Sequence, residues 1–111
     1  MLQPGEVVFI PFPFTDLATT TRRPVLLLRS MDGFGDFLAV AITSQSGHSD
    51  AIALRQDDFE EGTLPKASYV RTTKLYTLNK FAVAQRFGML TQDALARVLS
   101  AICSALGCDH H

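Results

Sequence analysis

Short apolar runs that each end at a turn signal constrain the fold of this chain more than any other feature. Residues 24–28 (PVLLL) form a continuous apolar run, which is typical of a strand buried on both faces. Other β-rich runs are bounded by glycine, proline or polar residues, which indicates further strands. These runs are residues 6–12, 37–43, 51–54, 68–71 and 81–87. Strands at this spacing, followed by one helix, predict a mainly β, antiparallel, barrel-like domain closed by a C-terminal helix.

The segments between these runs are expected to be loops or turns. Residues 15–22 are polar and rich in threonine, and residues 31–36 contain two glycines. Residues 44–50 (SQSGHSD) have the composition of a loop, and the acidic residues 56–64 predict a loop or a single turn. Residues 72–80 are expected to be less regular than the strands beside them.

The clearest helix is predicted over residues 91–106. Thr91 is placed to cap its N-terminus, Asp93 lies in the first turn, and Gly107 is placed to end it. An apolar face follows the helical repeat. Its members are Leu95, Val98, Leu99, Ile102 and Leu106. We expect this face to dock on the sheet.

A chain of 111 residues has room for a single domain, here residues 1–111. Neither a signal peptide nor an apolar run of about 18 residues is present in the sequence, so a cytoplasmic protein with no membrane span is expected. Cys103 and Cys108 lack the spacing of a disulfide framework or a zinc site. The sequence therefore predicts no metal and no cofactor.

The charge distribution is more informative than the net charge of -1. Residues 17–31 and 62–92 carry basic side chains and no acid, whereas residues 57–61 (DDFEE) form an acidic cluster. The two basic segments could fold into one positive surface that attracts nucleic acid. The alternative is an ordinary charge-mixed surface.

Arg23 is the first candidate for chemistry. It lies between a polar loop and a buried strand, and Pro24 restricts its backbone to extended conformations. Its planar set of donors suits a phosphate, especially while negative charge grows on phosphorus. A surface arginine beside a strand is the alternative.

Polar residues at two other strand ends could bind nucleic acid. Thr43, Ser44 and Gln45 carry hydroxyls and an amide that can bind phosphate or base edges, or simply start a turn. Basic residues lie near two tyrosines in the second group, a combination that suits single-stranded nucleic acid but also an ordinary solvated strand. This group consists of Arg71, Thr73 and Lys74, with Tyr69 and Tyr76 nearby.

Taken in order, these segments resemble the MazF/PemK family of toxins from type II toxin–antitoxin systems. The matching pieces are Gly5-Glu6-Val7-Val8, Arg23-Pro24-Val25-Leu26-Leu27, Ala41-Ile42-Thr43, Val70-Arg71, Thr77-Leu78-Asn79 and Leu106-Gly107. The resemblance implies an SH3-like β-barrel, a homodimer, and a cognate antitoxin peptide as partner. It also implies a sequence-selective, metal-independent endoribonuclease that cleaves single-stranded RNA. In that reaction the ribose 2′-OH attacks the adjacent phosphate and leaves a 2′,3′-cyclic phosphate.

The resemblance also implies roles for individual residues. Arg23 would stabilise the phosphorane, Thr43 would hold a phosphate oxygen, and Arg71 matches a basic residue of some members. Arg22, Ser44, Gln45, Thr73 and Lys74 complete the predicted RNA-binding set. Residues 15–22 match a loop that gates RNA and contacts the antitoxin.

The general base is unassigned, because two family acids are missing. Thr73 stands where some members have an acid two residues after the arginine, and threonines precede the Arg-Pro element. Asp16, Glu6 and His48 are the candidates, and Arg23 acting with a water molecule is the alternative. Two other functions stay open: a protein-binding gyrase toxin similar to CcdB, and a catalytically idle barrel that binds RNA or peptide.

Overall fold

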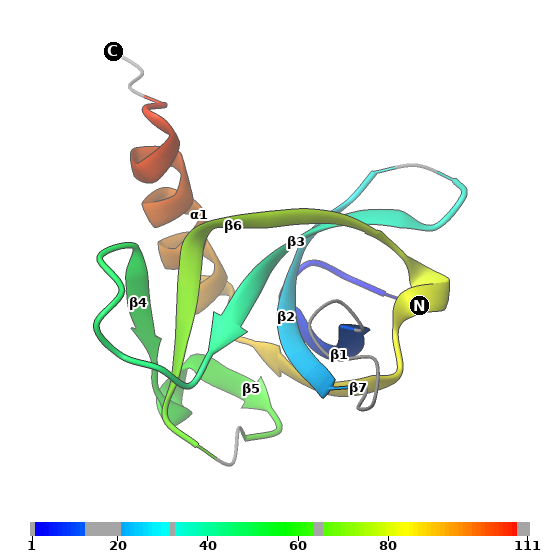
Figure 1. Ribbon diagram of the computed structural model, residues 1–111, viewed down its shortest axis with the longest axis horizontal. Helices are drawn as coiled ribbons and strands as arrows, with labels where there is room; N and C mark the ends of the chain where they lie inside the picture. Colours follow the sequence, from blue (N-terminus) through cyan, green and yellow to red (C-terminus); the bar gives the residue numbers. More distant parts are fainter. Residues whose placement is uncertain (1, 13–20, 32, 64–65, 109–111) are drawn as a thin grey trace.

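The computed structural model describes residues 2–12, 21–31, 33–63 and 66–108, and these residues form one curled antiparallel sheet with a C-terminal helix (Figure 1). The strands are β1 (Glu6–Phe12), β2 (Thr21–Ser30), β3 (Asp36–Thr43), β4 (Ala51–Leu54), β5 (Phe59–Glu61), β6 (Ser68–Asn79) and β7 (Gln85–Leu90). The helix is α1 (Gln92–Leu106), and the short 3-10 helices are η1 (Gln56–Asp58) and η2 (Lys80–Ala82). The prediction of a mainly β fold with a C-terminal helix is confirmed.

The sheet curls because its two edge strands follow one another in the chain. The strand order is β4-β6-β3-β2-β1-β7-β5, so β4 and β5 lie at opposite edges. Only Arg55 and η1 separate them in sequence. Five peptide steps from Leu54 to Phe59 span at most roughly 18 Å, so the two edges cannot move far apart. The result is a half-barrel (Figure 1).

Both faces of the sheet bury apolar side chains, as the run at residues 24–28 predicts. Leu26, Val40 and Val70 belong to a cluster that also holds Ala94, Val98 and Ile102 of α1. The second cluster lies on the other side of the same strands and consists of Val8, Ile10, Val25, Leu27, Phe37 and Ala39. Alternate residues of one strand therefore contribute to different cores.

The helix begins and ends where its caps predict. The Thr91 hydroxyl accepts a hydrogen bond from the Ala94 amide at 3.1 Å, and Gly107 ends the helix with φ +79°. The predicted apolar face is wider than the buried one, because Leu99 and Leu106 are 40% and 58% exposed. None of the helices in the described ranges is long and apolar enough to cross a membrane.

Several predicted boundaries are wrong. β6 continues through residues 72–79, because Tyr76 and Leu78 pair with Ala39 and Phe37 of β3. The strand predicted over residues 81–87 instead starts at Gln85, after η2, which the Asn79 side chain caps by accepting from the Phe81 amide. Residues 21–22, predicted as loop, already belong to β2, and residues 56–64 contain η1 and β5. For β2, β5 and β6, pairing with another strand outweighs the local sequence preference, whereas η1 agrees with the single turn predicted within residues 56–64.

Candidate functional site

Arg23 and Thr43 lie on the same face of the neighbouring strands β2 and β3. Val25 of β2 is directly opposite Ala41 of β3, which is the last pair of their register, and each strand continues beyond that pair, β2 through Arg23 and β3 to Thr43. Because side chains alternate along a strand, Arg23 shares the face of Val25 and Thr43 shares that of Ala41. This is the face away from α1. Arg23 is exposed, whereas Thr43 is half-buried.

Arg71 shares this face from the next strand. Thr43 is directly opposite Tyr69 of β6, and Arg71 follows two residues later on the same side of β6. From strand spacing and rise, the Cα atoms of Arg23 and Arg71 lie on the order of 12 Å apart. The fold therefore brings together three side chains that are far apart in sequence.

The Thr43 hydroxyl lies at a turn. It accepts a hydrogen bond from the Gln45 amide at 3.1 Å, which is the local turn geometry that such residues favour. The hydroxyl proton remains for donation to a ligand. Ser44 and Gln45 are exposed beside it, so all three predicted residues stay close to the end of β3.

Asp50 holds the part of the predicted site that lies on β6. This carboxylate was not among the residues that the sequence pointed to. Its Oδ1 accepts from Nε of Arg71 at 3.1 Å, and its Oδ2 accepts from the Thr73 hydroxyl at 2.5 Å and the Thr73 amide at 3.3 Å. Its backbone carbonyl accepts from the amide and hydroxyl of Thr72 at 3.0 and 2.8 Å. Residue 50 thus makes five hydrogen bonds to three successive residues of β6.

These bonds stabilise the ionised form of Asp50. The side-chain hydrogen bond from Thr73, with the bond and charge of Arg71, lowers its pKa from 3.8 to about 2 against the opposing effect of desolvation. The sequence alone carried no signal for this contact. It follows from strand register, because Ala51 of β4 pairs with Arg71 and the residue before it therefore meets Thr72.

An irregularity in β6 makes room for Asp50. Val40 of β3 is opposite Leu75, but Ile42 is opposite Val70, so residues 71–74 face only Ala41. The surplus residues bend the strand, and Figure 1 shows β6 changing direction sharply along its length. Lys74 lies in this bend and is exposed.

The candidates for the general base lie in different parts of the chain. Glu6 is buried, and its Oε2 accepts from Nε of Arg86 while its Oε1 accepts from the Gln3 amide at 2.7 Å. It lies at the start of β1, four residues from Ile10, which is the residue opposite Arg23, and its carboxylate is engaged by Arg86. His48 is half-buried in the loop before β4. Asp16 and most of the predicted gating loop at residues 15–22 lie outside the described residues.

Two side chains of the basic segments have partners away from Arg23. Arg86 pairs with Glu6 and Glu61, while Lys80 lies over the Phe81 ring at 5.3 Å, near the end of β6 that pairs with Asp36. Among the described residues no ion pair joins Arg23 to a carboxylate, and one positive surface formed by the two basic segments stays a prediction. Arg22 lies opposite Pro11 in the β1–β2 pairing.

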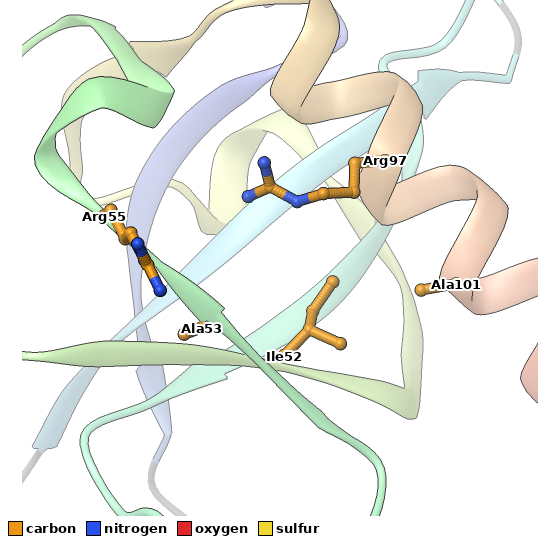
Figure 2. Close-up of a pocket in the computed structure, with 5 residues that line it drawn as sticks. All are labelled: Ile52, Ala53, Arg55, Arg97 and Ala101. Atoms are coloured by element: carbon orange, nitrogen blue, oxygen red, sulfur yellow. The ribbon is translucent and has the colours of Figure 1, made fainter.

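A separate open cavity of about 390 Å³ lies between β4 and α1 (Figure 2). Its lining residues are Ile52, Ala53, Arg55, Arg97 and Ala101. Arg97 extends from α1 and is held by Asp58 through two hydrogen bonds of 3.1 and 2.8 Å. The cavity contains none of the predicted site residues. The described residues contain no cluster of three or more His, Cys, Asp or Glu suited to a metal ion.

Comparison with solved structures places the fold among toxins and their complexes. An endoribonuclease bound to its cognate antitoxin, from a mycobacterial species, superposes with a TM-score of 0.78 at 19% identity and covers 100% of both chains. MazE–MazF (Form-II) from Deinococcus radiodurans gives 0.76 at 22% identity over 97% of each chain. Toxin MazF-mt6 of Mycobacterium tuberculosis gives 0.70 at 16% identity, over 95% of this chain and 99% of that chain.

The sequence itself matches a family. No curated protein matches the chain. The family described as PemK-like, MazF-like toxin of type II toxin–antitoxin system matches residues 3–106. That span contains every predicted site residue and all strands of the sheet. The chain therefore belongs to the PemK-like, MazF-like toxin family of type II toxin–antitoxin systems.

Proposed function

We propose that this protein is a sequence-selective endoribonuclease toxin that cleaves single-stranded RNA without a metal ion. The single observation that carries the proposal is the shared face of Arg23, Thr43 and Arg71 on three neighbouring strands. Family membership supports it, as do the names of the similar structures, which are endoribonucleases and MazF toxins.

The proposed reaction uses the RNA's own nucleophile. The ribose 2′-OH attacks the adjacent phosphorus, its proton passes to a base, and the 5′ oxygen of the next nucleotide leaves with a proton. The products are a 2′,3′-cyclic phosphate and a 5′-OH end. Because the nucleophile is already within the substrate, the enzyme needs to orient the phosphate and stabilise its growing charge.

Each side chain has one task in this proposal. Arg23 donates to the non-bridging oxygens, where negative charge increases in the transition state. The Thr43 hydroxyl donates to one of those oxygens and orients the phosphate. The terminal amines of Arg71 bind a phosphate, and the neighbouring nucleotides are contacted by Ser44, Gln45, Thr73, Lys74 and Arg22. Because a guanidinium stays protonated at neutral pH, Arg23 is not assigned as the base.

The proposed partners are an antitoxin peptide and a second copy of the chain. An acidic antitoxin segment would compete with RNA for Arg23 and its neighbours by charge complementarity. The similar complexes support this partner, since they are named as a toxin with its cognate antitoxin and as MazE–MazF. The homodimer and the cytoplasmic location stay predictions.

The test is cleavage of a long unstructured RNA by the purified protein in EDTA, with the product ends mapped. We expect discrete cuts with cyclic-phosphate ends. Arg23→Ala should lose at least roughly 100-fold in rate, since one donor to a developing oxyanion contributes about that much. Arg29→Ala is the matched control, because Arg29 is exposed on the same strand but lies opposite Leu38 toward its other end.

The other functions make different predictions in the same assay. An idle barrel would bind RNA without any turnover, even with enzyme in excess. A gyrase toxin would leave RNA intact and inhibit gyrase. If Arg23→Ala cuts RNA as fast as the unmodified protein, the assignment of Arg23 is wrong.

A further inference from the structure

We propose that Asp50 is a positioning residue of the RNA site, which holds the Arg71 guanidinium by Nε so that its two terminal amines face the phosphodiester. The inference rests on the proposed RNA cleavage. It concerns a residue that neither the sequence motifs nor the family resemblance singled out, and it assigns a task to the loop between β3 and β4.

The geometry of the Arg71–Asp50 pair leaves the functional edge of the arginine available. A guanidinium has five N–H donors, and the recorded contact to Asp50 uses the one at Nε. In the described ranges no carboxylate other than Asp50 lies within ion-pairing distance of Arg71. The Arg71 side chain keeps 23% of its surface exposed. The paired terminal amines can therefore bind two oxygens of one phosphate.

Asp50 itself is firmly held. Its carbonyl oxygen accepts from Thr72, and its carboxylate accepts from the hydroxyl and amide of Thr73. The Asp50 side chain is only 13% exposed. Fixing the carboxylate at several points limits the rotamers open to Arg71, which lowers the entropy that binding would otherwise cost.

The same residue joins the two halves of the site. The loop that begins at Thr43, Ser44 and Gln45 ends at Asp50, where β6 bends. Attaching Asp50 to β6 therefore fixes both the end of β3 and the arginine beside it. The proposed phosphate ligands come from these two places.

A role as general base does not fit. Hydrogen bonds from Thr73 and Arg71 lower the pKa of Asp50 to about 2, whereas an efficient base has a pKa near the working pH. Asp50 also brings a negative charge close to a polyanion. Simple electrostatics thus predicts that removing this charge would favour RNA, while positioning predicts the opposite. Loss of repulsion and loss of positioning change RNA binding and cleavage in opposite directions, so the direction of the change distinguishes them.

The experiment measures single-turnover cleavage and RNA affinity in EDTA for Asp50→Asn, with Asp57→Asn as the control. Asp57 is an exposed acid in η1, so its substitution changes net charge equally. We expect Asp50→Asn to cut roughly 10- to 100-fold more slowly, from the loss of a well-oriented donor. Asp57→Asn should keep the full rate. The pH profile of Asp50→Asn should keep its shape, and Asp50→Glu should recover part of the rate.

A double-mutant cycle tests whether Asp50 acts through Arg71. In an Arg71→Ala background, Asp50→Asn should cause no further loss, because the residue it positions is gone. Thr73→Val keeps the Asp50–Arg71 pair but removes the hydroxyl that donates to the Asp50 carboxylate. We therefore expect a smaller decrease in cleavage rate than for Asp50→Asn. If Asp50→Asn does not fold, the Thr73→Val result decides: an unchanged rate would overturn the proposal.

Three results contradict the inference. If the Asp50→Asn variant cuts RNA as fast as the unmodified protein, or faster, the Asp50 carboxylate acts only by repelling the RNA. Loss of one limb of the pH profile shows that Asp50 is the base. If the unmodified protein does not cut RNA, both the proposed function and the role of Asp50 are refuted. If cutting depends on Arg23 but not on Asp50, only the role of Asp50 is refuted.

Discussion

Arg97 of α1 holds Asp58 of η1 through two parallel hydrogen bonds, Nη1 to Oδ1 at 3.1 Å and Nη2 to Oδ2 at 2.8 Å. The same carboxylate accepts from the Arg55 amide at 2.8 Å. Asp58 lies where the chain passes from the β4 edge to the β5 edge. One buried carboxylate thus ties the helix to the segment that brings the two edges of the sheet together.

We expect Asp58→Ala to destabilise the protein by roughly 2–3 kcal/mol, because the Arg55 amide and the Arg97 guanidinium both lose their acceptor. Arg97→Ala should cost less, about 1 kcal/mol, since 51% of the Arg97 side chain is exposed. Urea unfolding with an unchanged m-value measures both. Asp57→Asn is the control, and an equal effect there would show that the contact is unimportant.

Acid should remove part of the stability. The pKa of Asp58 is lowered by its hydrogen bond to Arg97, and that of Asp50 is lowered from 3.8 to about 2. Carboxylates with lowered folded-state pKa values stabilise the fold above their unfolded value of about 3.9, and this stabilisation is lost as the pH falls through the folded-state value.

The unfolding midpoint measured at each pH should therefore decrease as the pH is lowered from about 4 to about 2. The double variant Asp50→Asn/Asp58→Asn should show a weaker decline over this interval. Equal pH dependence in the double variant and the unmodified protein would contradict the assignment to these two carboxylates.

Glu6 is expected to be structural. Its buried carboxylate joins Arg86 and the Gln3 amide, so Glu6→Gln should cost about 2 kcal/mol. Glu61→Gln is the matched control, since Glu61 pairs with the same arginine at the surface, where such pairs contribute little. Chemical denaturation measures both variants.

The same variant separates structure from chemistry. At a temperature where Glu6→Gln is fully folded, we expect it to cleave RNA at the unmodified rate, because Glu6 is committed to Arg86. A loss of cleavage without unfolding would restore Glu6 as a candidate base.

Gly88 permits the close approach of β7 to the C-terminal end of β5. A Cβ at this position would lie 2.4 Å from the Glu61 carbonyl oxygen, which belongs to the backbone and cannot move alone. Gly88→Ala should destabilise by about 2–3 kcal/mol through strand separation. Gly33→Ala is the control, since nothing lies within 4 Å of its Cβ position. Similar midpoints for both variants in thermal unfolding would contradict this prediction.

Local features of the fold were predictable because they depend on neighbouring residues. The apolar run at residues 24–28 predicted a strand buried on both faces, and its residues do divide between the two cores. Thr91 and Gly107 cap α1 as expected. β6 was only partly predicted, because the regularity of residues 72–79 comes from pairing with β3 and not from their own preference.

The sequence by itself determined the approximate positions of β1 to β4 along the chain, the helix with its caps, and the candidates Arg23, Thr43 and Arg71. Only the tertiary structure decided which carboxylates pair with which arginines. Asp50 meets Arg71 from 21 residues away, and Glu6 meets Arg86 from 80 away. Spacing in the chain cannot reveal such contacts, because they arise from strand register and from the bend in β6, which are set by packing of the whole sheet.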